Sequence, residues 1–183
     1  MTSPKPALAF ASLLLLMVAA TQGRADSLAD PAAINARIDA CLHRADMSQT
    51  CIGQEALRCS AEEQGAANPA QQIGWCAGAE QDVWKERMKS DFAAITKLLP
   101  KGPALRAFMA QQRLWQAYAH DAFPYDHVDA AFPWAYWGQL GRLSVVATRA
   151  LQVRDIRMMI EECFAQDSDI RPQHLCDEIS GKP

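Results

Sequence analysis

The sequence has no surplus of positive charge and few histidines. Lys and Arg number 18 against 21 Asp and Glu, which gives a net charge of −3, and there are 4 His. Proteins that bind nucleic acids usually carry a basic patch or stripe, so this composition argues against a nucleic-acid partner. The chain also lacks the GxSxG, HExxH, P-loop and GxGxxG motifs of common enzyme classes. We therefore expect a protein that is not an enzyme and uses no cofactor.

Long hydrophobic runs are also lacking, with one exception. Residues Ala7–Ala20 form an apolar run after Lys5, and small residues follow it up to Ala25. This layout is typical of a secretory signal peptide, and the run is shorter than the roughly 20 residues that span a bilayer. We predict a signal peptide over residues 1–25, cleaved after Ala25 or Ala20, and no permanent membrane anchor. The mature protein would be periplasmic or secreted, with 16 basic residues against 21 acidic ones, a net charge of −5.

Six cysteines remain in the mature chain, and in an exported protein an even number indicates disulfide bonds. A metal site is the alternative, because a thiol stands two residues from an imidazole at Cys41 and His43 and again at His174 and Cys176. Zinc sites more often use C-x₂₋₄-C and H-x₃₋₅-H spacings, and no CxxC or CxxCH motif is present. We therefore favour disulfides and expect no metal.

The hydrophobic spacing of the mature chain is helical throughout, and no segment alternates polar and apolar residues long enough to predict a strand. Asp30-Pro31 and Asn68-Pro69 each pair a capping residue with proline at the first helical position, and Thr50 can cap another helix. We expect an all-α fold in a single domain over residues 26–183. The predicted architecture is a small antiparallel helical bundle with disulfide-linked N-terminal helices, starting from Pro31 and continuing over 51–65, 69–99, 105–122 and 140–164, with a short helix after Pro172.

Short connections make consecutive helices antiparallel, and this fixes which cysteines face each other. A chain that folds back near residue 46 brings Cys41 to Cys51, and one that folds back near residue 67 brings Cys59 to Cys76. Cys51 and Cys59 cannot bond each other, because eight residues of one helix separate them by about 12 Å. The first two predicted disulfides are therefore Cys41–Cys51 and Cys59–Cys76, and elimination leaves Cys163–Cys176 as the third.

The sequence carries Cys76, Glu80 and Trp84, then Gln112, Arg113 and Trp115, then Asp121 after His120, and finally Arg149 before Ala150-Leu151. These motifs resemble those of the lysozyme inhibitor LprI-like family of small exported helical proteins. The resemblance covers about residues 41–155, which would form the core of the domain, with 156–183 as a C-terminal extension. It implies an exported binding protein, and one branch of the family is associated with lysozyme inhibition.

These motif residues have a structural interpretation, which we favour over direct ligand contact. Antiparallel register would place Arg113 beside Asp91 as an ion pair and Trp115 in the core near Met88. Glu80 and Asp121 would lie farther along the same hairpin and meet each other, Arg142 or Arg149. Two neighbouring carboxylates can also serve acid–base catalysis, although no pocket or nucleophile motif supports that role here.

The segment Phe123–Trp137 is the candidate binding loop. It holds six of the 14 aromatic residues of the chain, and Tyr and Trp are common anchors of protein interfaces. An acidic aromatic loop suits a cationic partner protein such as a lysozyme. The alternative is that these rings simply cap the bundle. The residues proposed to contact the partner are Tyr125, Asp126, His127, Asp129 and Trp134.

Three functions remain open at this point. The first is an exported binding protein, in particular a lysozyme inhibitor that occludes the partner's cleft. The second is a non-inhibitory helical protein of the cell envelope with a structural or interaction role. The third is a metal-binding protein or hydrolase that uses His120, Asp121 and His127, although adjacent residues on a helix point in different directions and we expect surface histidines here.

Overall fold

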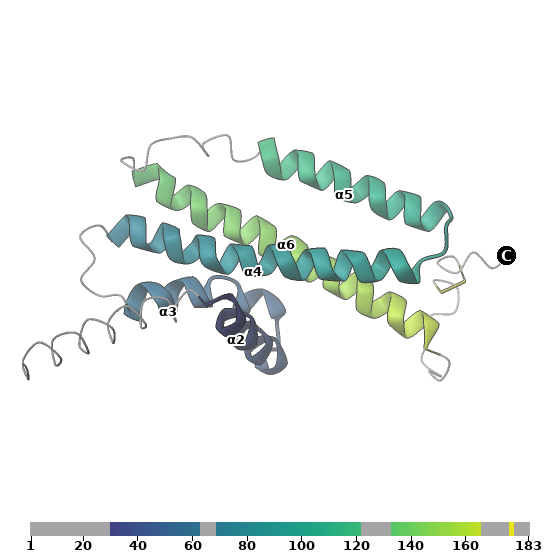
Figure 1. The fold of residues 1–183 in the computed structure, drawn as a ribbon, viewed down its shortest axis with the longest axis horizontal. Helices are drawn as coiled ribbons and strands as arrows, with labels where there is room; N and C mark the ends of the chain where they lie inside the picture. The colour runs from purple at the N-terminus through teal and green to yellow at the C-terminus, as the bar shows by residue number, and fades with distance from the viewer. Residues whose placement is uncertain (1–29, 63–68, 122–132, 166–175, 178–183) are drawn as a thin grey trace, which may run out of the picture.

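The computed structural model describes residues 30–62, 69–121, 133–165 and 176–177, and every regular element within them is helical. The predicted all-α fold is confirmed. The expected signal peptide lies outside the described residues, as does the last short helix apart from Cys176 and Asp177. The elements are α2 (Pro31–Arg44), the 3₁₀-helix η1 (Ser48–Cys51), α3 (Gln54–Glu62), α4 (Pro69–Leu98), α5 (Pro103–Asp121) and α6 (Pro133–Phe164) (Figure 1).

Helix α2 begins as its capping signal predicts. The Asp30 carboxylate accepts a hydrogen bond from the backbone N–H of Ala32 at 3.0 Å, and Pro31 occupies the first turn, where the missing N–H of proline has no cost. Ile34 and Ile38, one turn apart, are buried and anchor the helix to the core. Helix α4 likewise begins at Pro69 as predicted, whereas α5 begins at Pro103, two residues before the predicted start at 105.

The start predicted at Thr50 is wrong. Thr50 lies inside η1, where its hydroxyl donates to the carbonyl of Met47 at 2.8 Å, and α3 begins only at Gln54. The chain between them turns at Gly53, whose φ of 82° lies in the left-handed region that favours glycine. A regular helix cannot pass through such a residue, so the predicted helix over 51–65 is shortened at its start.

All three predicted disulfides are present. Cys41 bonds Cys51, Cys59 bonds Cys76, and Cys163 bonds Cys176, with Cα–Cα separations of 5.8, 5.8 and 5.2 Å. The first closes the connection between α2 and η1, the second joins α3 to α4, and the third ties Cys176 to the last turn of α6. Antiparallel register therefore identified the first two pairs, and elimination gave the third.

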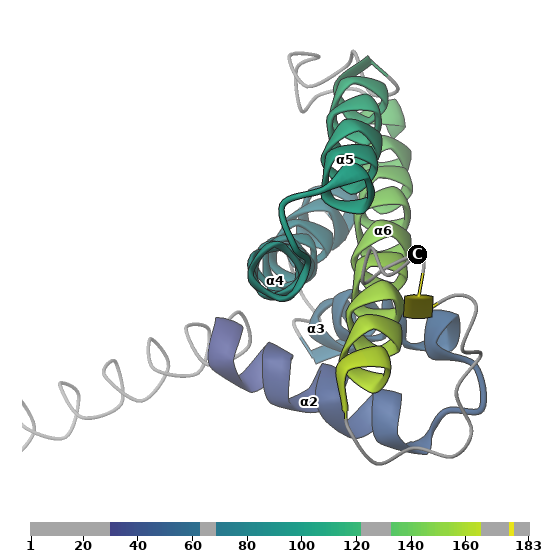
Figure 2. The ribbon, with the colours of Figure 1, turned by 90° about the vertical axis from the view of Figure 1, so that its right-hand side faces the viewer.

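The centre of the molecule is a parallel pair of long helices, α4 and α6 (Figure 1). Near their starts Gly74 lies close to the Gln139 side chain, and farther along Asp91 contacts Arg157, so both helices run in the same direction. Helix α5, which lies between them in the chain, runs in the opposite direction, so α4, α5 and α6 alternate in direction, whereas α2 crosses them at a steep angle (Figure 1 and Figure 2). The core is built mainly on the central pair and includes Trp84, Ile95, Leu143, Val146, Ala147 and Val153.

The remaining helices cover opposite sides of this pair. Both views place α5 on one side and α2 with α3 on the other (Figure 1 and Figure 2). None of the helices in the described part of the chain combines the length and apolar character needed to cross a membrane.

Helix α6 begins at Pro133, seven residues before the predicted start at Leu140. The prediction treated this proline as part of a loop, but proline is preorganised for the first turn of a helix. Residues 133–137, including the backbone of Trp134, are therefore helical rather than part of a loop, and the proposed contact of Trp134 with a partner stays a prediction.

Helices α4 and α5 pack about three residues out of the predicted register. The rings of Phe92 and Phe108 stack with centroids 5.1 Å apart, and the Gln112 amide donates to Met88 Sδ at 3.8 Å. Gln112 thus occupies the place predicted for Trp115, which is half-buried against the core. The turn between Leu98 and Pro103 is tighter than sequence reasoning assumed, and this shifts every facing pair.

Candidate functional site

The motif Cys76-x₃-Glu80-x₃-Trp84 forms a stripe on α4 that faces α3. Glu80 is fully buried, and its carboxylate accepts hydrogen bonds from the backbone N–H groups of Gly53 and Ala56, each at 2.8 Å. It also accepts one from the Trp84 indole at 3.0 Å. A helix leaves its first N–H groups without internal partners, and a negative charge near them is favourable. Glu80 therefore caps α3 from a neighbouring helix, and the predicted meeting with Asp121 is wrong.

The second motif attaches α5 to α6. Arg149 donates to the Gln112 side-chain oxygen from Nε at 3.2 Å and from Nη2 at 3.0 Å, and Nη1 donates to Gln152 at 3.2 Å. Burial lowers the pKa of the Arg149 guanidinium, because these partners are neutral amides and water is partly excluded. Gln112 and Arg149 thus have a structural role.

The predicted Arg113–Asp91 ion pair is wrong. Arg113 is exposed on α5, whereas Asp91 pairs with Arg157 of α6 at 2.7 Å. The reason is the shift in register between α4 and α5, which turns Arg113 outward and leaves Asp91 facing the parallel neighbour.

His120 and Asp121 come closer than the sequence argument allowed. Their Nδ1 and Oδ1 atoms lie 3.2 Å apart, because both side chains are free to turn at the last residues of α5. The two side chains are 89% and 80% exposed, so the pair lies on the surface. Among the described residues there is no group of three His, Cys, Asp or Glu side chains placed to hold a metal ion.

Of the predicted binding residues, Tyr125, Asp126, His127 and Asp129 lie outside the described residues. Trp134 falls in the first turn of α6, and its side chain is not described. The candidate loop therefore stays a prediction from the sequence.

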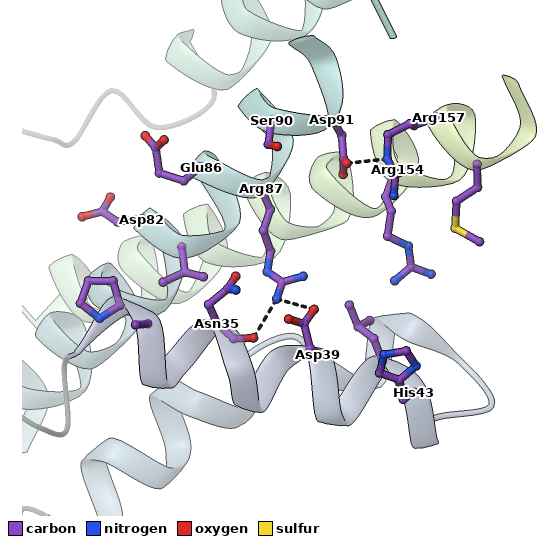
Figure 3. Close-up of a pocket in the computed structure, with 15 residues that line it drawn as sticks. Asn35, Asp39, His43, Asp82, Glu86, Arg87, Ser90, Asp91, Arg154 and Arg157 are labelled. Atoms are coloured by element: carbon purple, nitrogen blue, oxygen red, sulfur yellow. Dashed lines mark hydrogen bonds and ion pairs between the residues drawn. The ribbon is translucent and has the colours of Figure 1, made fainter. Parts of the chain in front are cut away.

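The described surface has a groove that the sequence analysis did not identify. It lies between α2 on one side and α4 with α6 on the other, with a volume of about 880 Å³ (Figure 3). Leu42, Val83 and Met158 supply apolar surface, and the remaining lining is mostly charged. The charged lining residues are Asp39, His43, Asp82, Glu86, Arg87, Asp91, Arg154 and Arg157.

Two of the three groove arginines hold the helices together. Arg87 of α4 donates to the Asn35 carbonyl and to the Asp39 carboxylate of α2, both at 2.7 Å. Arg157 of α6 donates to Asp91 of α4 at 2.7 Å and to both carboxylate oxygens of Glu161. The bonds to Glu161, followed by the charge of Asp91, raise the pKa of the Arg157 guanidinium despite its partial burial.

The third arginine, Arg154, has weaker partners. Its Nη2 lies 3.5 Å from the Ser48 hydroxyl, and its Nε lies 3.5 Å from Asp155 Oδ1 without hydrogen-bond geometry. Nε is buried and has no hydrogen-bond acceptor. Figure 3 shows the guanidinium pointing from α6 into the groove, above His43 of α2. The sequence carries one hint of this site, the Arg154-x₂-Arg157 spacing that puts two cations on one face of a helix.

Comparisons with protein-family models, with curated proteins and with solved structures gave no match to this chain.

Proposed function

We propose that this protein is an exported binding protein that acts by protein–protein occlusion, with a lysozyme as the partner to test first. The observation that supports this most is the use of the motif residues. Cys76, Glu80 and Trp84 hold α3 on α4, and Gln112 with Arg149 holds α5 on α6. When the motif residues maintain the helix packing, the surface of the scaffold is left free for recognition. In an enzyme, by contrast, we would expect the motif residues to gather at one reactive centre.

Three disulfides in a chain of this size support export to an oxidising compartment, the periplasm or the exterior. The net charge of −5 expected for the mature chain would favour encounter with a cationic protein, because opposite net charges raise the association rate. Both features suit a partner such as lysozyme, and the resemblance to the LprI-like family points to the same partner.

The direct test is a turbidity assay in which purified, oxidised protein is added to lysozyme acting on bacterial cell walls. We expect slower clearing with increasing protein, together with complex formation in a separate binding measurement. Added salt should weaken binding mainly through the association rate, since exposed charges farther apart than about 8 Å are largely screened at physiological ionic strength. Complex formation without slower clearing would favour the non-inhibitory interaction protein. The absence of both complex formation and slower clearing would contradict this proposal.

The candidate loop gives a sharper test of where the contact lies. Replacing Tyr125, Asp126 and Trp134 together by Ala should abolish binding while leaving helical content unchanged, because interface anchors each contribute roughly 2 kcal/mol or more. A matched control is Leu114→Ala with Tyr118→Ala, which removes two apolar side chains that are 72% and 59% exposed on α5. If the control abolishes binding and the loop variant does not, the contact lies on α5 and the loop assignment is wrong.

A further inference from the structure

The α2/α4/α6 groove contains three arginines whose hydrogen bonding differs sharply. Arg87 and Arg157 each have carboxylate partners at 2.7 Å, so their charges are neutralised by Asp39 and Asp91. Arg154 has a neutral hydroxyl at 3.5 Å and a neighbouring carboxylate at the same distance without hydrogen-bond geometry. A guanidinium carries five N–H donors, and Arg154 is the one of these three arginines whose donors make no hydrogen bond to a carboxylate; the unpaired Nε of Arg87 is buried.

The unused donors are accessible from the groove. The Arg154 side chain is 23% exposed although its Nε is buried, so the polar edge that a ligand can reach is the pair of Nη atoms. No hydrogen bond from Nη1 to any described residue is present. Figure 3 shows this edge turned toward the space between α6 and α2, above His43, and Met158 also lines the groove. The groove thus offers a planar, two-pronged donor next to apolar surface.

A planar donor of this kind matches a carboxylate or a phosphate in a bidentate arrangement. The surroundings discriminate between the two. Asp39, Asp91 and Asp155 lie near the arginines, and a phosphate group with a charge of about −1.5 to −2 would be repelled more strongly than a singly charged carboxylate. Leu42, Val83 and Met158 also favour a ligand whose carboxylate is joined to apolar groups.

We propose that the α2/α4/α6 groove binds a peptide segment through one of its carboxylates, with Arg154 as the anion-binding residue. His43 lines the same end, Ser48 already contacts Arg154, and both can add hydrogen bonds, while Met158 and Leu42 pack against a neighbouring apolar side chain of the peptide. This site is separate from the aromatic loop and does not rest on lysozyme inhibition. The carboxylate is either a chain terminus or an acidic side chain, and the two sources are distinguished by experiment.

The test uses the oxidised mature protein and four probes. The first is an acetylated tripeptide of alanine and leucine with a free C-terminal carboxylate, and the second is the C-terminal amide of the same tripeptide. The third is a peptide blocked at both ends whose single carboxylate is a glutamate side chain, and the fourth is inorganic phosphate. Binding is followed by ¹H–¹⁵N NMR, including the Arg154 Nε–H resonance. We expect at least one carboxylate peptide to shift this resonance and the amides of Ser48 and His43. The carboxylate peptide that binds more tightly shows whether the groove prefers a chain terminus or an acidic side chain. The C-terminal amide, which has no carboxylate, should shift none of these resonances.

Arg154→Gln should weaken binding of the carboxylate peptide by at least about tenfold, equivalent to ~1.4 kcal/mol. The matched control is Arg106→Gln, which removes an exposed arginine of α5 outside the groove and should leave binding unchanged. Equal binding of amide and carboxylate, tighter binding of phosphate, or an unchanged dissociation constant in Arg154→Gln would each overturn the proposal. If Arg154→Gln does not fold, the comparison of amide with carboxylate on the unchanged protein decides the outcome alone.

Discussion

At the scale of single residues, Glu80 is the clearest case of a charge placed for structure. A buried carboxylate is costly unless its oxygen atoms are hydrogen-bonded, and here three N–H groups satisfy it. Two of these belong to the start of α3, where backbone N–H groups have no helical partner. Glu80 and the α3 terminus therefore satisfy each other's hydrogen-bonding needs, and neither can be removed alone without leaving buried polar groups unpaired.

We predict that Glu80→Ala destabilises the fold by about 3 kcal/mol or more, since each buried donor left unpaired costs roughly 1–3 kcal/mol. Glu80→Gln should cost less, because the amide keeps one acceptor oxygen and the volume of the side chain. Chemical denaturation monitored by circular dichroism measures both. The control is Glu86→Gln, whose side chain is 74% exposed, and it should leave the midpoint unchanged. Similar midpoints for Glu80→Ala and Glu86→Gln would contradict the capping role.

At the scale of elements, α5 is the helix with the least anchorage. Only Phe108 and Gln112 are buried along its 19 residues, whereas Leu114 and Tyr118 are largely exposed. Its polar attachment to α6 depends on Arg149 and neutral amides. Elements with few buried apolar contacts open at lower free energy than the core. Helix α5 is therefore the part of the described structure expected to open first.

Hydrogen exchange measures this directly. Amides of α5 should exchange faster than those in the middle of α4 and α6, and Phe108→Ala should accelerate α5 further while changing α3 little. Truncating a buried phenylalanine typically costs about 3–5 kcal/mol, and loss of the stacked contact with Phe92 falls on α5. Leu114→Ala serves as the control, because an exposed side chain contributes little packing. Uniform exchange across α4, α5 and α6 would show that α5 opens only with the whole fold.

At the scale of the whole molecule, the two sides of the α4–α6 pair are held by different means. On one side α5 is attached by side-chain packing and by the Arg149–Gln112 hydrogen bonds, and on the other α2 and α3 are held by Arg87, Glu80 and two disulfides. The α2 wall of the groove is therefore held by its disulfide to η1 and by the Arg87 bonds to α4. A rigid wall suits a binding groove, because less conformational entropy is lost when a ligand binds.

We expect the double variant Cys59→Ala and Cys76→Ala to lose about 3 kcal/mol of stability, as estimated for a closed loop of this length. Amides of α3 should lose more protection from exchange than those of α6. In contrast, Cys163→Ala with Cys176→Ala should leave α3 protection intact, because that bond lies at the end of α6. Denaturation and exchange on the two double variants separate these effects, and equal loss of α3 protection in both would refute the assignment.

Local chemistry in the sequence determined much of this structure. Proline after a capping residue marked the starts of α2 and α4, and cysteine spacing across short turns identified all three disulfides. These signals act over a few residues or across one tight connection, so they do not depend on the rest of the fold. Proline can begin a helix or belong to a loop, and the predicted start of α6 was therefore placed too late, at 140 instead of Pro133. The turn at Gly53 likewise moves the start of α3 to Gln54, later than predicted.

Only the tertiary structure decided which helix faces meet. Because α4 packs parallel to α6, Asp91 forms its ion pair with Arg157 instead of Arg113. The packing of α4 against α3 places Glu80 at the start of α3, where it bonds Ala56, 24 residues earlier in the chain. The groove around Arg154 likewise joins residues from α2, α4 and α6 that no spacing in the sequence connects. Such contacts result from burying several apolar helix faces at once, and the lowest free energy belongs to the whole arrangement of helices. A pattern along one helix therefore reveals that a face is buried, while the packing of all the helices selects its partner.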